Sequence, residues 1–137
     1  MAHFHKLKVF IGTTVLLLLS MAGFAQPLNG VYTVGGTTPN YPTLTDAVND
    51  LVANGVSGPV TFNLRNGTYS GAQYSIPAIT GASGTNRIIF QSETGLPANV
   101  TISYQSGSSG GNYIFQLDGA SFITLKIVTL ANTATAD

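Results

Sequence analysis

Val60-Thr61-Phe62-Asn63-Leu64 decides the expected fold of this chain, because apolar and polar residues alternate along it. Alternation with a period of two predicts a β-strand that buries one face. Two similar segments follow it, and a second series of apolar segments is offset from the first. The first series continues with Arg87-Ile88-Ile89-Phe90-Gln91 and Tyr113-Ile114-Phe115-Gln116-Leu117, and the second comprises Ile76–Ile79, Val100–Tyr104 and Phe122–Leu125.

The spacing within each series indicates stacked repeats. Phe62 and Phe90 are 28 positions apart, and Phe90 and Phe115 are 25 apart. In the second series, Ile102 lies 23 positions from both Ile79 and Leu125. Periods of roughly 20 to 50 residues are typical of solenoids, in which each unit buries its face against the next. We therefore predict that the members of each series stack on one another.

Residues 1–25 have the order of a secretory signal peptide. A basic start with Lys6 and Lys8 precedes an apolar run from Val9 to Leu19, and small residues follow up to Ala25. This order predicts cleavage after Ala25. The alternative is a membrane anchor, which needs about 20 apolar residues. The run is much shorter, so we expect no stable membrane span after cleavage.

The rest of the chain carries few charges. Only three cationic side chains remain after residue 25, namely Arg65, Arg87 and Lys126, against five acidic ones. This is not the basic stripe of a nucleic-acid-binding protein, so we expect no nucleic-acid partner. The chain has no cysteine, and both histidines precede residue 25. The usual nucleophile–base pairs and soft metal ligands are therefore missing, and we assign no catalytic, cofactor-binding or metal-binding residue.

One amphipathic helix is predicted over Leu44–Ala53. Thr43 is suited to cap its first turn, Asp46 is favourable near the positive end of the helix dipole, and Gly55 is suited to end it. A helix of this length is marginal alone, so we expect it to cover the open end of the strand stack. Its predicted apolar stripe comprises Leu44, Val48, Leu51 and Val52.

Several polar motifs allow a functional and a structural interpretation. Asp46 and Asp50 share a helix face and could form a metal or acid–base pair, but we favour a solvated outer face. Gly107, Gly110 and Gly111 resemble a phosphate-binding loop, but the GK[ST] signature and a following helix are missing, so a surface loop is favoured. Asp118 precedes Gly119 and is read as a turn residue rather than a calcium ligand. Asn66-Gly67-Thr68 and Asn99-Val100-Thr101 match the glycosylation pattern, which means little in a bacterial host.

The tyrosines are the one hint of a ligand surface in the sequence. Aromatic rings stack on sugars, but the same residues are common in strands because they pack well there. We favour core or strand-edge packing. The six tyrosines are Tyr32, Tyr41, Tyr69, Tyr74, Tyr104 and Tyr113.

An ordered series of segments runs through the chain, namely Gly30–Gly36, Tyr41–Val48, Gly55–Leu64 and Gly67–Tyr69, continued by Arg87–Ser92 and Leu117–Leu125. This series resembles the N-terminal part of secreted right-handed parallel β-helix proteins of the Bacteroidota, relatives of the pectin-lyase-like fold. The resemblance implies an extracellular or surface protein whose helix caps the N-terminal end of the solenoid. It also implies a larger parent protein, often with a C-terminal signal for type IX secretion.

Two departures from this family limit what the resemblance implies. Ile127 stands where the family often has a polar residue, frequently Asn, so the usual inward Asn ladder is not expected here. The cleft-lining residues of pectin-cleaving members lie later in such chains, so no catalytic residue is carried over. Whether the chain belongs to an enzyme stays open.

We therefore expect an all-β, right-handed parallel β-helix. Residues 1–25 are the signal peptide, residues 26–59 the N-terminal strand and capping helix, and residues 60–137 the first two to three coils, truncated. The expected role is adhesion or glycan binding, with a polysaccharide or cell-surface glycan as partner and no cofactor. The alternative is part of a polysaccharide lyase or glycoside hydrolase with its catalytic coils beyond residue 137. A third interpretation, a β-sandwich, is disfavoured by the helix.

Overall fold

The computed structural model describes residues 25–107 and 111–133. The predicted signal peptide, apart from Ala25, lies outside these residues. The described part is mostly β-strand with a single α-helix, so the predicted all-β class is confirmed. The elements are β1 (Leu28–Val34), α1 (Leu44–Asn54), β2 (Val56–Leu64), β3 (Gly67–Ser70), β4 (Tyr74–Pro77), β5 (Ile88–Ser92), the 3-10 turn η1 (Pro97–Asn99), β6 (Val100–Tyr104), β7 (Phe115–Asp118), β8 (Ile123–Lys126) and β9 (Thr129–Asn132).

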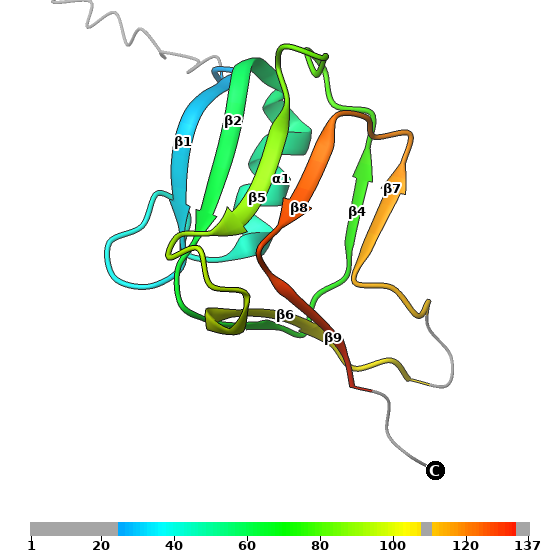
Figure 1. Cartoon of the computed structure of the whole chain (residues 1–137). Coiled ribbons are helices and arrows are strands. Elements are labelled where there is room, and N and C mark those ends of the chain that lie inside the picture. Colours follow the sequence, from blue (N-terminus) through cyan, green and yellow to red (C-terminus); the bar gives the residue numbers. More distant parts are fainter. Residues whose placement is uncertain (1–24, 108–110, 134–137) are drawn as a thin grey trace, which may run out of the picture.

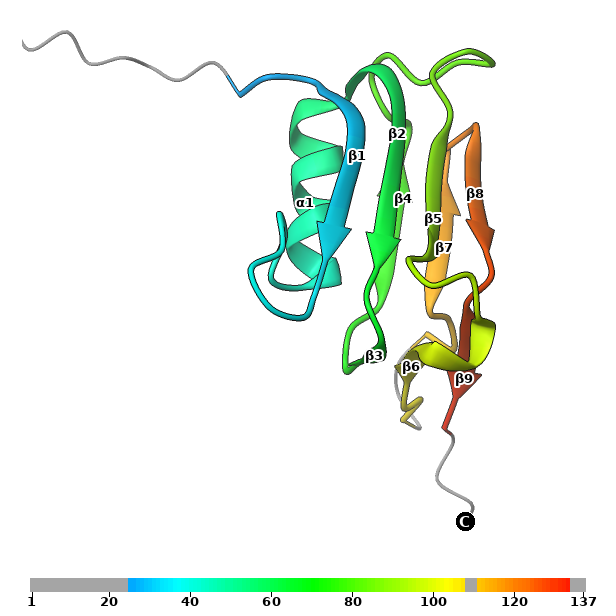
Figure 2. The ribbon, with the colours of Figure 1, turned by 60° about the vertical axis from the view of Figure 1, so that its left-hand side comes forward.

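The strands form three parallel sheets, which the chain visits in turn (Figure 1). The first sheet has the order β1-β2-β5-β8, the second β3-β6-β9 and the third β4-β7. All six strand pairs in these sheets are parallel. After β2, β3 and β4, the chain returns to the first sheet with β5, and each later strand pairs with the previous strand of its own sheet. Figure 2 shows the resulting stack, with α1 and β1 at one end and β8 and β9 at the other.

The two predicted repeat series are only partly correct. Phe62 pairs with Phe90 in the first sheet, as their spacing predicted. Phe115, however, pairs with Tyr74 in the third sheet, and the next partner of Phe90 is Leu125. The second series is drawn from β4, β6 and β8, which belong to three different sheets. The turns between strands differ in length, so similar spacing along the sequence does not place two strands in one sheet.

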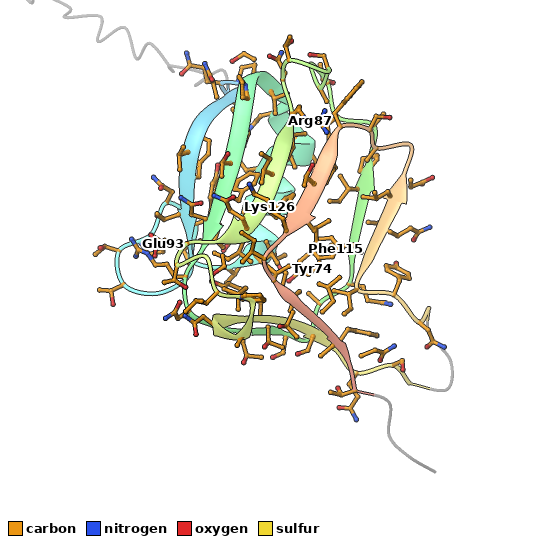
Figure 3. The ribbon with its side chains drawn as sticks, viewed as in Figure 1. Tyr74, Arg87, Glu93, Phe115 and Lys126 are labelled. Carbon is orange, nitrogen blue, oxygen red and sulfur yellow. The ribbon has the colours of Figure 1, made fainter. Side chains whose placement is uncertain are left out.

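Inward-facing apolar residues fill the space between the three sheets. Alternate residues of β2 and β5 are buried, as the period-two pattern predicted. The rings of Phe62 and Phe90 stack with centroids 4.8 Å apart. Tyr74 and Phe115 make a second stack across the third sheet, at 5.0 Å (Figure 3). Because burying one large apolar side chain stabilises the fold by about 1.5–3 kcal/mol, these ladders are a main source of stability.

The predicted helix is confirmed with its capping residues. The Thr43 hydroxyl accepts from the Asp46 backbone N–H, the Asp46 carboxylate accepts from the Thr43 N–H, and Gly55 ends the helix at a φ of +66°. The apolar stripe differs from the prediction at one position, because Val52 is 41% exposed. Val52 comes eight residues after Leu44, so its side chain lies roughly 80° around the helix axis from that of Leu44, away from the centre of the stripe. The buried residues are Leu44, Ala47, Val48 and Leu51.

Helix α1 packs against β1, β2 and β4 at one end of the stack. The strand that follows it starts earlier than the predicted boundary at residue 60, because Val56–Pro59 already belong to β2. The β1–β2 register shifts here, with Leu28 opposite Val56 and Gly30 opposite Val60. Pro59 lies within this bulge, where its missing N–H costs no ladder hydrogen bond.

The two ends of the stack differ in how well their apolar residues are covered. Leu117 on β7 is 50% exposed, whereas its strand partner Ile76 is buried. Leu130 on β9 is 51% exposed, whereas its partner Ile102 is buried. At the helix end, the corresponding inward residue Leu28 is buried. The last strands of the third and second sheets, β7 and β9, therefore present an apolar surface that no described residue covers. We call this surface, formed by Leu117 and Leu130, the β7–β9 face.

Candidate functional site

The two helix carboxylates do not form a joint site. Asp46 completes the capping box with Thr43. Asp50 accepts hydrogen bonds from the Tyr41 hydroxyl and from the Asn54 amide. Each carboxylate therefore has a separate structural partner. The prediction that Asp50 simply faces water is wrong, because Tyr41 folds back over the helix and leaves Asp50 half-buried.

The contact between Tyr41 and Asp50 shifts the acidity of the phenol. Burial raises the pKa of Tyr41 above its ordinary value, and the hydrogen bond and negative charge of Asp50 raise it further. Desolvation disfavours the phenolate, and a neighbouring carboxylate repels it. Tyr41 is therefore a neutral hydrogen-bond donor, which is a structural role and not that of a general base.

The other polar motifs also occupy ordinary surface positions. Asp118 ends β7 and is exposed. Within residues 25–107 and 111–133, no three His, Cys, Asp or Glu residues gather as a metal site would require. Asn66 is exposed, while Asn99 lies in η1 and donates to Thr94. Of the glycine-rich loop, Gly110 lies outside the described residues.

Tyrosine packing agrees with the structural interpretation at the positions where contacts are defined. Tyr32 and Tyr41 both lie against the Phe62 ring, with centroids 5.8 and 5.9 Å away. Tyr74 is buried, and burial is the main cause of its raised pKa. Tyr69 and Tyr74 also border a groove, and of these two Tyr69 is the more exposed.

This groove is the candidate functional site of the described chain. It has a volume of about 400 Å³ and runs along β3, below the start of α1. Three segments enclose it: the glycine pair after β1, the first residues of α1 with those just before it, and β3 itself. We call it the β3 groove, and it is lined by Gly35, Gly36, Pro42, Thr43, Leu44, Thr45, Asn66, Gly67, Thr68, Tyr69, Ser70 and Tyr74.

Tyr69 is held rigidly at the groove wall. Its hydroxyl lies 2.8 Å from the carbonyl oxygens of both Val34 and Arg65. Burial raises the pKa of Tyr69, so the phenol stays a donor. A Cβ at Gly35 would lie 2.6 Å from that hydroxyl, and Gly35 has a φ of +74°. Only glycine fits this position without strain.

Sequence reasoning did not find this groove, because its residues come from three separated segments. The one local signal was the adjacent pair Gly35-Gly36 directly after a strand, since two consecutive glycines often mark a backbone that side chains would obstruct. Both have a positive φ. The polar residues of β3 look like an ordinary surface strand until the fold places α1 above them.

In the described residues, no helix combines the length and the apolar character needed to cross a membrane. Comparison of the chain with family models, with curated proteins and with solved structures found no match.

Proposed function

We propose that this chain is the N-terminal segment of a right-handed parallel β-helix in a secreted or cell-surface protein. In this proposal the segment is non-catalytic and closes one end of the β-helix, and the protein serves adhesion or glycan binding. Support comes from the repeated visit of the chain to three parallel sheets and from α1, which covers one end of the stack. The residues from β2 onward then form the first coils.

One observation carries the proposal, namely the uncovered β7–β9 face. Leu117 and Leu130 continue inward ladders whose previous members, Ile76 and Ile102, are buried. Each ladder would gain burial from one further strand in the same register. Exposed sheet edges with apolar side chains favour strand pairing. This favours a segment on which further coils stack.

Self-association of residues 26–137 tests the proposal. Analytical ultracentrifugation over a range of concentrations should show association that increases with concentration. The double variant Leu117→Lys with Leu130→Lys should remain monomeric, because charges on the β7–β9 face oppose edge pairing. Val31→Lys is the matched control, since Val31 is 65% exposed on β1, and it should associate like the parent. A parent that stays monomeric at all concentrations would contradict the proposal.

Export is tested separately through the signal peptide. Protein collected after export should begin at Gln26, because the basic, apolar and small-residue order of residues 1–25 directs cleavage after Ala25. Intact-mass measurement reads the new terminus directly. Exported protein that keeps residues 1–25 would exclude this processing.

A further inference from the structure

The β3 groove lies at a vacant strand position of the second sheet. At the helix-covered end, β1 adjoins β2 in the first sheet and α1 packs on β4 of the third sheet. Among the described residues, no strand adjoins β3 on the side away from β6. The edge of a sheet presents backbone N–H and C=O groups without strand partners. The groove therefore offers hydrogen-bond donors and acceptors along one side.

The lining of the groove is polar but uncharged. Hydroxyl groups come from Thr45, Thr68 and Ser70, and a carboxamide comes from Asn66. Asn66, Thr68 and Ser70 are exposed to solvent and so can reach a ligand, although the Asn66 carboxamide oxygen also accepts from the Thr94 hydroxyl at 3.3 Å. No Asp, Glu, Lys or Arg is among the lining residues. Groups of this kind exchange hydrogen bonds with neutral hydroxyls and do not select for a charged ligand.

The nearest charges already have partners. The Asp46 carboxylate lies 2.6 Å from the Thr43 hydroxyl and 3.1 Å from the Thr43 N–H, and it offsets the positive end of the α1 dipole. The Arg65 Nε atom lies 3.5 Å from Glu93 Oε2, and the Arg65 guanidinium also donates to the Thr37 carbonyl. The start of α1 is therefore not an anion site, which disfavours phosphate or an acidic sugar in the groove.

The size and rigidity of the groove favour a small ligand. A volume of about 400 Å³ lies at the lower end of the range for small-molecule pockets, roughly 300–1,000 Å³. The Tyr69 ring, fixed by its two carbonyl contacts, supplies an apolar wall against which the C–H face of a sugar ring can pack. A preformed wall lowers the entropy lost on binding.

We propose that the β3 groove binds a neutral saccharide of one or two rings. The sugar hydroxyls bond to the β3 edge and to the Asn66, Thr68 and Ser70 side chains, and one ring face packs on Tyr69. This inference rests on the proposed function and names the site and the ligand class for glycan binding. An extended peptide that adds a strand to β3 is the competing occupant.

The test is an NMR titration of residues 26–137 carrying Leu117→Lys and Leu130→Lys, two changes outside the groove that keep the chain monomeric, with four neutral disaccharides: maltose, cellobiose, mannobiose and diacetylchitobiose. At least one should cause saturable shifts of the Gly35, Gly36, Gly67 and Thr68 amides, with a dissociation constant on the order of millimolar. Digalacturonate should bind at least tenfold more weakly than that sugar. A hexapeptide of alternating Thr and Val should not shift the β3 amides.

Two variants separate groove binding from general effects. Ser70→Arg places a long side chain in the groove and should weaken binding at least tenfold. Ser75→Arg makes the same change at an exposed residue of β4 that does not line the groove, and it should bind like the parent. Both should melt at the parent temperature. Three results would overturn the proposal: no saturable shift with any neutral disaccharide, tighter binding of digalacturonate, or peptide-induced shifts along β3. None of them alters the self-association that tests the proposed function.

Discussion

Phe62 stacks on Phe90 with ring centroids 4.8 Å apart and an interplanar angle of 17°. The two residues are direct partners in the parallel β2–β5 pair. A register slip by one residue would turn the slipped strand's ring out toward solvent, so burial of this stack holds the register of the first sheet. Tyr32 and Leu125 extend the ladder on either side.

Phe90→Ala should therefore lower the free energy of unfolding by about 3–5 kcal/mol, because it leaves a cavity between two sheets. Ile89→Ala is the matched control. Ile89 follows the opposite face of the same strand and is only half-buried, so its loss should cost about 1 kcal/mol. Urea unfolding measures both values. Equal losses for the two variants would contradict the assigned register.

Adjacent residues of α1 should respond very differently to a charge. Leu51 is buried under the first and third sheets, whereas Val52 is 41% exposed. Leu51→Asp should cost about 4 kcal/mol or more, because it buries a carboxylate without a partner. Val52→Asp should cost less than about 1 kcal/mol. Thermal melts compare them, and a Val52→Asp variant as unstable as Leu51→Asp would show that the helix is rotated from its assigned orientation.

Asp50 should contribute to stability through Tyr41, although it lies on the outer side of the helix. Asp50→Ala removes the acceptor of both Tyr41 and Asn54. A hydrogen bond to a charged group is worth about 1.5–3 kcal/mol when buried, and partial exposure reduces this to about 1 kcal/mol. Denaturant unfolding at neutral pH measures the loss. A silent substitution would indicate that Asp50 is solvated instead.

The contact between Tyr41 and Asp50 should also make the free energy of unfolding fall in alkali. The folded chain holds the Tyr41 proton at pH values at which the unfolded chain, with an ordinary tyrosine pKa of about 10, releases it. The native state then binds more protons than the unfolded state, so the free energy of unfolding decreases as pH rises above about 10. Asp50→Asn should weaken this dependence, since the repelling charge is gone. The alkaline rise in near-ultraviolet absorbance, which reports phenolate from all six tyrosines, should be complete at a lower pH in that variant.

Two nearby glycines should differ sharply in their tolerance of alanine. A Cβ at Gly81, which has a φ of +84°, would overlap the carbonyl oxygen of Val56. The backbone is held close there by the hydrogen bond from the Val56 N–H to the Thr80 carbonyl, at 2.8 Å. Gly81→Ala should cost about 2 kcal/mol or more. Gly84→Ala meets no atom within 4 Å and should be neutral or slightly stabilising. Thermal melts of both variants decide the point.

Local patterns predicted the elements well but the strand partners poorly. Thr43 and Gly55 predicted the two ends of the helix, because capping involves groups within one turn of each other, and the structure adds the reciprocal bond from Asp46 to Thr43. The alternation over Val60–Leu64 predicted which side of β2 is buried. In contrast, spacing along the sequence places Phe115 in the series of Phe62, although it pairs with Tyr74. All these strands satisfy the same period-two pattern, so the pattern cannot distinguish one sheet from another.

The sequence by itself determined the class of the fold, the capped helix and the inward face of the long strands, because these depend on neighbours a few residues apart. Only the tertiary structure decided the three-sheet order, the role of Asp50 and the β3 groove. Each of these depends on turn lengths and on contacts between distant segments. Tyr69 and Gly35 are 34 positions apart, and they meet only because β1 and α1 close one end of the stack.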